Sequence, residues 1–88
     1  MVWNVSFEPR ALKELGRLDR EAQRRIARFF GERVEGGADP RQWGKPLTGD
    51  KVGLWRYRIG PYRAVCSIDD SRHTVLILRV AHRKQVYR

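Results

Sequence analysis

The chain has 88 residues, with 19 lysines and arginines against 10 aspartates and glutamates, so its formal net charge is +9. This length allows one domain with a modest core, and we treat residues 1–88 as a single domain. The single cysteine, Cys66, excludes an internal disulfide, and two histidines are too few to indicate a metal site. No apolar run approaches the roughly 18 residues of a membrane-spanning helix, and no signal-peptide pattern opens the chain. We therefore expect a cytoplasmic protein with no membrane partner, metal or other cofactor.

The positive charge is concentrated in the second half of the chain. Residues 1–50 carry 10 basic and 8 acidic side chains, whereas residues 51–88 carry 9 basic and 2 acidic ones. This asymmetry is typical of a surface that binds a polyanion, such as a nucleic acid or the ribosome. An acidic protein partner is a compatible alternative, and a charged face that only keeps the protein soluble is a third interpretation.

The first part of the chain predicts a short strand and two helices. Residues 2–7 alternate apolar and polar side chains, as a strand with one buried face does. Pro9 suits the first turn of a helix, and apolar residues follow it at helical spacing. Asp19 is placed to cap a second helix, which should end at the pair Gly36-Gly37. The two helices form an amphipathic hairpin.

The second part of the chain predicts a loop and then three strands. Residues 38–53 are rich in proline and glycine and are expected to form the loop. The strands are expected at 54–59, 62–69 and 73–81, separated by Gly60-Pro61 and by residues 69–71. The order β-α-α-β-β-β predicts an α+β fold. In this fold a helical hairpin packs on one face of a small, largely antiparallel sheet and leaves the other face open.

Strand parity assigns the side chains of these strands to the two faces, because successive side chains point to opposite sides. On this rule the open face receives Arg56, Arg58 and Arg63, while the core receives Trp55, Tyr57, Ile59, Tyr62, Ala64, Cys66 and Ile68. In the last strand we expect Leu76, Leu78 and Val80 in one row and Val75, Ile77 and Arg79 in the other. The core should include Leu15, Phe29, Trp55, Tyr57, Leu76 and Leu78, with Arg79 on the open face.

The stretch WRYRIGPYR (55–63) places three arginines on one hairpin. Arginine presents a planar fork that matches phosphate oxygens and also stacks on bases, so several on one face predict a phosphate or RNA platform. Alternatively, Arg56 and Arg58 cover the sheet with their apolar stems and pair with carboxylates elsewhere.

The end of the chain, VAHRKQVYR (80–88), adds groups that can move protons or stabilise charge: His82, Arg83 and Tyr87. Cleaving RNA without a metal needs a base for the 2′-OH, cations for the phosphorane and an acid for the 5′-oxygen. The sequence supplies many cations and few bases. A purely structural role is the alternative for both His82 and Tyr87.

Several short motifs occur in an order that resembles the RelE/ParE toxin superfamily, and its RelE branch in particular. They are ALKELGRL at 11–18, Lys45-Pro-Leu, Tyr62-Arg63 after a glycine turn, and VAHRKQVY at 80–87. The resemblance covers nearly the whole chain. It implies the toxin of a type II toxin-antitoxin system, neutralised by a cognate antitoxin protein.

The RelE branch implies a ribosome-dependent endoribonuclease, which cuts mRNA in the ribosomal A site by 2′-OH attack, leaves a 2′,3′-cyclic phosphate and so inhibits translation. By position, Arg56 and Arg58 match basic residues around the scissile phosphate, and Arg63 matches a phosphate-binding arginine. Arg83 matches the arginine assigned to leaving-group protonation or transition-state stabilisation, and Tyr87 the proposed general base. Further candidate residues are Arg79 and Lys45 for substrate binding and His82 as a second acid or base.

Two departures from the family pattern affect this interpretation. Arginine replaces the lysines frequent at positions 56 and 58, and arginine cannot exchange a proton. More of the chemistry then falls on Tyr87, whose ordinary pKa of about 10 must be lowered by the neighbouring cations. The chain also ends one residue after Tyr87.

Two alternatives remain: a ParE-like toxin that poisons DNA gyrase without nuclease activity, and a plain RNA-binding module.

Overall fold

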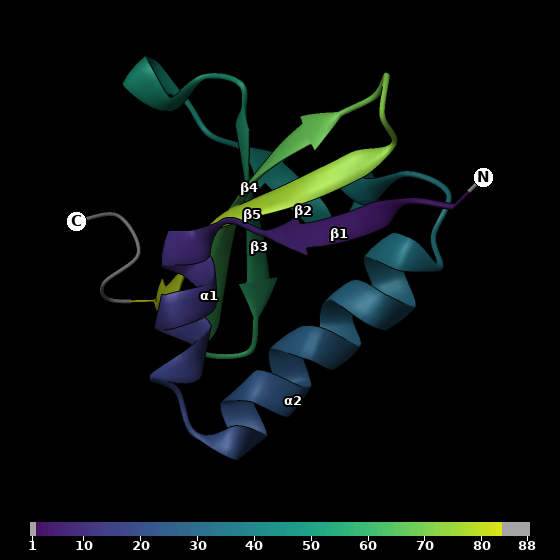
Figure 1. Ribbon diagram of the computed structural model, residues 1–88. Helices are drawn as coiled ribbons and strands as arrows, with labels where there is room; N and C mark the ends of the chain where they lie inside the picture. Colours follow the sequence, from purple (N-terminus) through teal and green to yellow (C-terminus); the bar gives the residue numbers. More distant parts are fainter. Residues whose placement is uncertain (1, 84–88) are drawn as a thin grey trace.

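In the computed structural model, which describes residues 2–83, two helices pack against a five-stranded mixed sheet (Figure 1). The helices are α1 (Pro9–Gly16) and α2 (Arg20–Phe29), and the strands are β1 (Asn4–Phe7), β2 (Gly44–Pro46), β3 (Leu54–Ile59), β4 (Tyr62–Asp69) and β5 (Thr74–His82). The strand order is β1-β5-β4-β3-β2, with β1 parallel to β5 and the other pairs antiparallel. The predicted α+β fold is confirmed.

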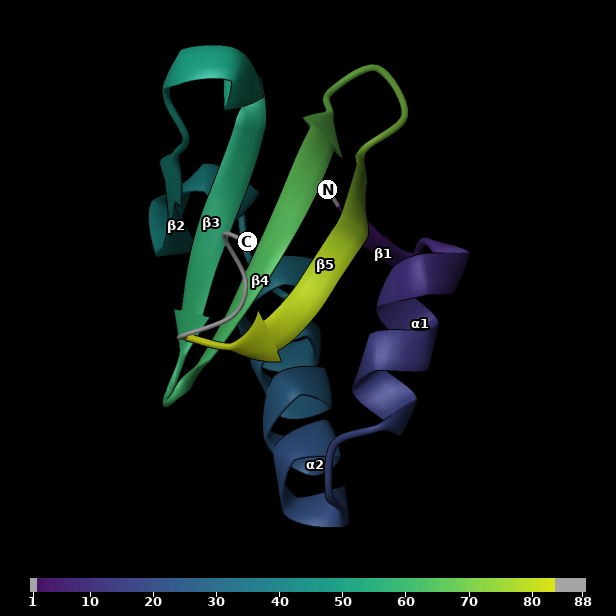
Figure 2. The same cartoon turned by 90° about the vertical axis from the view of Figure 1, so that its left-hand side faces the viewer.

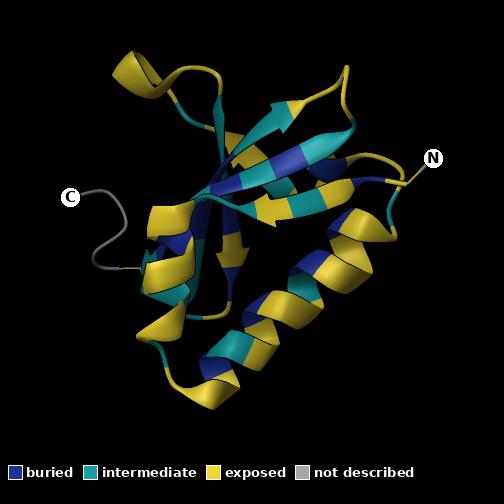
Figure 3. Cartoon of the chain, viewed as in Figure 1, coloured by how far each residue is buried: buried dark blue, intermediate teal, exposed yellow. Residues whose placement is uncertain are grey.

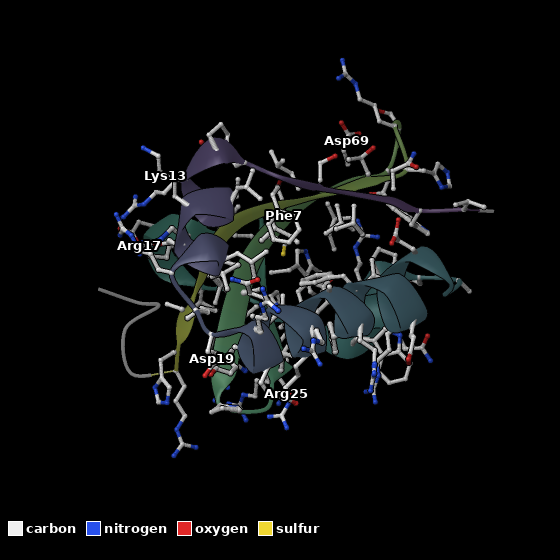
Figure 4. All side chains as sticks on the ribbon, turned by 60° about the horizontal axis from the view of Figure 1, so that its bottom comes forward. Phe7, Lys13, Arg17, Asp19, Arg25 and Asp69 are labelled. Carbon is white, nitrogen blue, oxygen red and sulfur yellow. The ribbon has the colours of Figure 1, made fainter. Side chains whose placement is uncertain are left out.

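Local sequence signals set the ends of the helices. Glu8 caps α1 by accepting a hydrogen bond from the backbone N–H of Arg10, at 3.0 Å. Asp19, in the turn between the helices (Figure 4), caps α2 by accepting from the N–H of Ala22 at 2.8 Å. The helix continues beyond α2 as one wider π-helical segment, η1 (Phe30–Glu35), and ends at Gly36. The predicted cap at Asp19 and the predicted glycine stop are therefore confirmed, whereas the Glu8 cap was not predicted.

The core lies between the helices and the sheet, and the helices turn their buried residues inward (Figure 3). Tyr57 of β3 is fully buried at its centre, with its ring in edge-to-face contact with the rings of Phe29 and Phe30. Its hydroxyl donates a 2.7 Å hydrogen bond to the carbonyl of Pro40. Burial raises the pKa of Tyr57, which stays neutral as a structural donor. Of the other expected core residues, Trp55, Phe29 and Leu15 are only half-buried and pack around this centre.

The predicted face assignment of β5 is wrong over its first half. Val75 and Ile77 are fully buried, whereas Leu76 and Leu78 are half-exposed. A register shift in the β4–β5 pair explains this, because Cys66 pairs with Ile77 and Val65 pairs with Arg79, which leaves Leu78 as the extra residue of a β-bulge. Parity reverses at the bulge, so Val80 is buried as predicted.

The segment 38–53, predicted to be a loop, contains the short edge strand β2 and two turns of 3-10 helix, η2 (Pro40–Trp43) and η3 (Gly49–Lys51). Gly44 explains why β2 can lie so close to β3. A Cβ at this position would come within 2.9 Å of the Arg56 carbonyl oxygen and 3.1 Å of the Tyr57 ring. A glycine read as a loop signal thus serves close strand packing.

Candidate functional site

The β3–β4 hairpin carries the arginines that the sequence singled out. Gly60, at the turn, has φ +59°, which glycine adopts without strain. The register pairs Arg58 with Arg63 and Arg56 with Val65. Residues paired across two strands share a face, so these arginines point to the side opposite Tyr57 and Ala64, both fully buried. The predicted separation of aromatic and arginine side chains on β3 is confirmed.

The edge strand β2 extends this arrangement, because Lys45 pairs with Arg56. One cross-strand row therefore contains Lys45, Arg56 and Val65, and the next contains Arg58 and Arg63. We call Lys45, Arg56, Arg58 and Arg63 the basic face. Figure 2 looks on to this side of the sheet, where α2 lies behind the strands.

The ion pairs between described residues lie away from Lys45, Arg56 and Arg58. They are Arg10–Glu14, Arg28–Glu32, Arg41–Asp39, Arg41–Asp70, Arg72–Asp69 and Arg79–Glu14. Within residues 2–83, Lys45, Arg56 and Arg58 form no ion pair. The Nε of Arg56 is also enclosed without a hydrogen-bond acceptor. Among the described residues, Arg56 and Arg58 therefore lack the carboxylate partners that the alternative interpretation expects.

Arg63 is oriented by the turn beside it. Its Nη1 donates to the carbonyls of Tyr62 at 3.1 Å and Gly60 at 3.4 Å. These bonds hold the guanidinium at the hairpin end of the basic face. A cation fixed before an anion arrives loses less side-chain entropy on binding than a free one.

Arg79 pairs with Val65, which in turn pairs with Arg56, so Arg79 lies on the same side of the sheet as Arg56. Its side chain, however, is hydrogen-bonded to Glu14 of α1. Its Nε donates to both oxygens of Glu14, at 2.9 and 3.2 Å, and the backbone N–H of Val80 donates to Glu14 at 2.9 Å. β1 pairs with β5 only as far as Ile77, so Glu14 caps a backbone donor at the edge that β1 leaves open. This geometry gives Arg79 a structural partner.

The last described residues bring β5 to the same end of the sheet. The N–H of Arg83 donates to the Pro61 carbonyl at 2.9 Å, which fixes the backbone of this exposed arginine beside the hairpin turn. His82 pairs with Tyr62, and their rings lie 6.0 Å apart, edge to face. The half-buried His82 thus lies on the core side, as strand parity predicted. Tyr87 lies outside the described residues.

Two hollows on the surface share Arg58 in their lining, and the sequence analysis predicted neither of them. A cleft of about 180 Å³ is lined by Gln42, Trp43, Gly44, Lys45, Arg56 and Arg58. A groove of about 550 Å³ lies between α2, η1 and the end of β3, and its lining includes Arg24, Arg25, Arg28, Arg33 and Arg58 with Glu21 and Glu32. Arg25 is labelled on α2 in Figure 4. The helical spacing of the α2 arginines was a signal for the groove, whereas nothing local in the sequence indicated that Trp43 is exposed.

The described part of the chain contains neither a cluster of metal ligands nor a membrane-spanning helix. No set of three or more His, Cys, Asp and Glu residues within 2–83 is grouped so as to hold a metal ion. Over the same residues, no helix has the length and apolarity to cross a membrane. Cys66 is buried, and burial raises the pKa of its thiol.

Known sequences similar to this chain include toxins. A family model described as the ParE toxin of type II toxin-antitoxin system, parDE, matches residues 5–87. Toxin RelG of Mycobacterium tuberculosis is 36% identical over 89 residues, covering 100% of this chain and 99% of that protein. Toxin RelE of the same organism is 36% identical over 87 residues, covering 98% of this chain and 87% of that protein.

Solved structures with this fold include toxins in complex with antitoxins. The toxin-antitoxin complex RelBE2 of Mycobacterium tuberculosis contains a chain with a TM-score of 0.85 and 34% identity, covering 94% of this chain and 93% of that one. The RelE-RelB complex of Pyrococcus horikoshii gives a TM-score of 0.73 and 27% identity, covering 98% of this chain and 100% of that one. The fold and these similarities define the toxin component of a type II toxin-antitoxin system. The chain belongs to the RelE/ParE toxin family, and it is RelE-like within that family.

Proposed function

We propose that this toxin is a ribosome-dependent endoribonuclease that cleaves mRNA in the A site and thereby inhibits translation. The observation that carries the proposal is the basic face, where strand register gathers Lys45, Arg56, Arg58 and Arg63 and three of the four have no ion pair within residues 2–83. Like charges on neighbouring strands repel, so folding alone does not favour this arrangement. A phosphodiester supplies the missing negative charge.

The proposed reaction is an internal transesterification. The 2′-oxygen attacks the adjacent phosphorus, the bond from phosphorus to the 5′-oxygen breaks, and the products are a 2′,3′-cyclic phosphate and a 5′-hydroxyl. Arg56, Arg58 and Arg63 would hold the phosphate and stabilise the negative charge that grows on its oxygens. Arg83, placed beside the hairpin turn, would stabilise the leaving 5′-oxygen until it takes a proton from water and becomes the 5′-hydroxyl.

Proton transfer needs separate groups, because an arginine stays charged throughout. Tyr87 is the proposed base for the 2′-OH proton, and cations near a tyrosine favour its ionised form. His82 is the second candidate, although its half-buried position on the core side of β5 favours it less. Arg79, held by Glu14, would support the sheet more than the substrate.

We also propose that a cognate antitoxin neutralises the toxin, as the similarity to chains in toxin-antitoxin complexes supports. Its toxin-binding segment, of about 20–30 residues, should be acidic and also bring apolar side chains, because charge attraction alone raises the association rate more than the lasting affinity. This segment would cover or distort the basic face.

Programmed ribosomes carrying a defined mRNA test the nuclease activity. The parent should cut the mRNA in the A site, and Arg83→Ala and Tyr87→Phe should each slow cutting about 100-fold or more. Both variants should keep the circular dichroism spectrum and the antitoxin affinity of the parent. If Tyr87→Phe cuts as fast as the parent, Tyr87 is not the base, and His82 or a ribosomal group takes its place.

The second candidate function is a gyrase poison, which the ParE description of the matching family model favours. A supercoiling assay with purified DNA gyrase separates the two functions. Inhibition of gyrase by a protein that leaves ribosome-bound mRNA intact would overturn the nuclease proposal.

A further inference from the structure

Trp43 is an exposed aromatic residue beside the basic face. It retains 40% of its accessible surface, although tryptophan is usually well buried. It lines the 180 Å³ cleft together with Lys45, Arg56 and Arg58, the three basic-face residues without an ion pair in residues 2–83. Gln42, which can donate and accept hydrogen bonds, lines the same cleft.

The backbone around Trp43 is held firmly against the sheet. The hydroxyl of Tyr57 donates to the carbonyl of Pro40, at the start of η2, and Trp43 ends the same turn. Gly44 then lets the chain lie against the Tyr57 ring, where any side chain would collide. The backbone that carries the exposed indole is therefore fixed by buried contacts on either side of it in the sequence, which favours a preorganised binding residue.

Arg33 supports the indole from the side of the helices. Its guanidinium carbon lies 5.0 Å from the centre of the Trp43 ring. Arg33 lines the large groove and not the cleft, whereas Trp43 lines the cleft. The arginine thus leaves the cleft side of the ring accessible to a ligand.

We infer that this cleft is a nucleobase subsite, in which Trp43 stacks on an RNA base whose phosphate is held by Lys45, Arg56 and Arg58. The volume of about 180 Å³ suits one base and is smaller than the roughly 300–1,000 Å³ typical of a site for a whole drug-sized ligand. Stacking on aromatic side chains beside a positively charged track is how single-stranded RNA is commonly bound. The inference rests on the proposed function for its substrate and assigns Trp43 the positioning of a base next to the bound phosphate.

The test measures binding without cleavage. The probe is a fluorescently labelled hexaribonucleotide of mixed sequence, 2′-O-methylated so that no 2′-OH attack can occur, and the reference is the same backbone without bases. In about 50 mM salt, where phosphate contacts are strong, the parent should bind the base-containing probe about tenfold more tightly than the abasic one. Trp43→Leu should bind both probes with the parent's abasic affinity, and Trp43→Phe should keep most of the preference.

Leu12→Ala is the matched control, because Leu12 is an exposed apolar residue of α1 that does not line the cleft. It should leave both affinities unchanged. Equal binding of the two probes by the parent, no binding of the base-containing probe, or a full base preference in Trp43→Leu would each overturn the inference. An apolar antitoxin side chain in the cleft would instead appear as lost antitoxin affinity in Trp43→Leu with no base preference in the parent.

The cleavage assay on ribosomes is read separately. If the protein prefers the base-containing probe but cuts no mRNA, the subsite is supported and the proposed nuclease function is contradicted. If the protein cuts mRNA but shows no base preference, the nuclease function is supported and the subsite is contradicted.

Discussion

The two faces of the sheet around the β3–β4 hairpin differ in whether their polar and charged side chains have partners within the described residues. On the core face, Tyr57, Ala64 and Cys66 are fully buried, and the one buried hydroxyl has its acceptor. On the basic face, Lys45, Arg56 and Arg58 are without ion pairs in residues 2–83, although described carboxylates pair with other arginines. The polar group on the core face therefore has its partner within the chain, whereas we propose that Lys45, Arg56 and Arg58 take theirs from a bound anion. On this proposal, folding and binding depend on opposite faces of the same part of the sheet.

The largest stability effect should come from Ile77, which is fully buried on the core face of β5. Ile77→Ala should lower the free energy of unfolding by about 2–5 kcal/mol, because it removes buried apolar atoms and leaves a cavity. Urea unfolding measures the loss. The neighbouring Leu78→Ala is the control, and its half-exposed position in the bulge predicts a clearly smaller loss. A larger loss for Leu78 would mean that the bulge is misplaced.

The Glu14→Ala substitution tests whether Glu14, a carboxylate away from the basic face, stabilises the fold. Glu14→Ala should cost about 1–3 kcal/mol, because the half-buried Arg79 and the N–H of Val80 both lose their acceptor. Glu32→Ala removes an exposed carboxylate 4.0 Å from Arg28 and should cost less than about 0.5 kcal/mol. Thermal unfolding of the two variants compares these losses, and equal losses would remove the edge-capping role of Glu14.

Tyr57→Phe removes only the buried hydroxyl of the core face. It should cost about 1–2 kcal/mol, because the Pro40 carbonyl loses its donor while the aromatic packing stays. Urea unfolding should show the loss with an unchanged denaturant slope. A neutral substitution would indicate that water replaces the hydroxyl as the donor.

The smallest effect should come from Asp70, which is exposed and pairs with Arg41 at 2.6 Å. The hydrogen bond from Arg41 lowers the pKa of Asp70 below its usual 3.8. The carboxylate therefore adds stability above pH 3.8, and this contribution is lost as the pH falls through the lowered pKa. The melting temperature of Asp70→Asn should lie slightly below that of the parent at pH 7, and the difference should shrink as the pH falls below 3.8. A difference that grows at low pH would contradict this assignment.

The sequence predicted the β3–β4 hairpin well, because apolar residues and arginines alternate from Trp55 to Ile59 and Gly60-Pro61 marks the turn. The prediction failed in β5, where residues 75–78 are all apolar. Alternation of apolar and polar residues therefore cannot show which side chains face the core, and the bulge reverses the assignment. The edge strand β2 was missed because its pairing with β3 depends on a long-range contact at Gly44. For the same reason the exposure of Trp43 could not be predicted.

The measurement that tests the division between the two faces most directly is the cleavage rate of ribosome-bound mRNA by Arg56→Gln/Arg63→Gln. Its control is Arg17→Gln/Arg20→Gln, which removes the same charge from exposed positions outside the sheet and so keeps the change in long-range attraction to RNA equal. We predict that the first variant cuts about 100-fold more slowly than the control, while both have the melting temperature of the parent within a few degrees. Equal cleavage rates in the two variants, or unfolding of the first, would contradict the account.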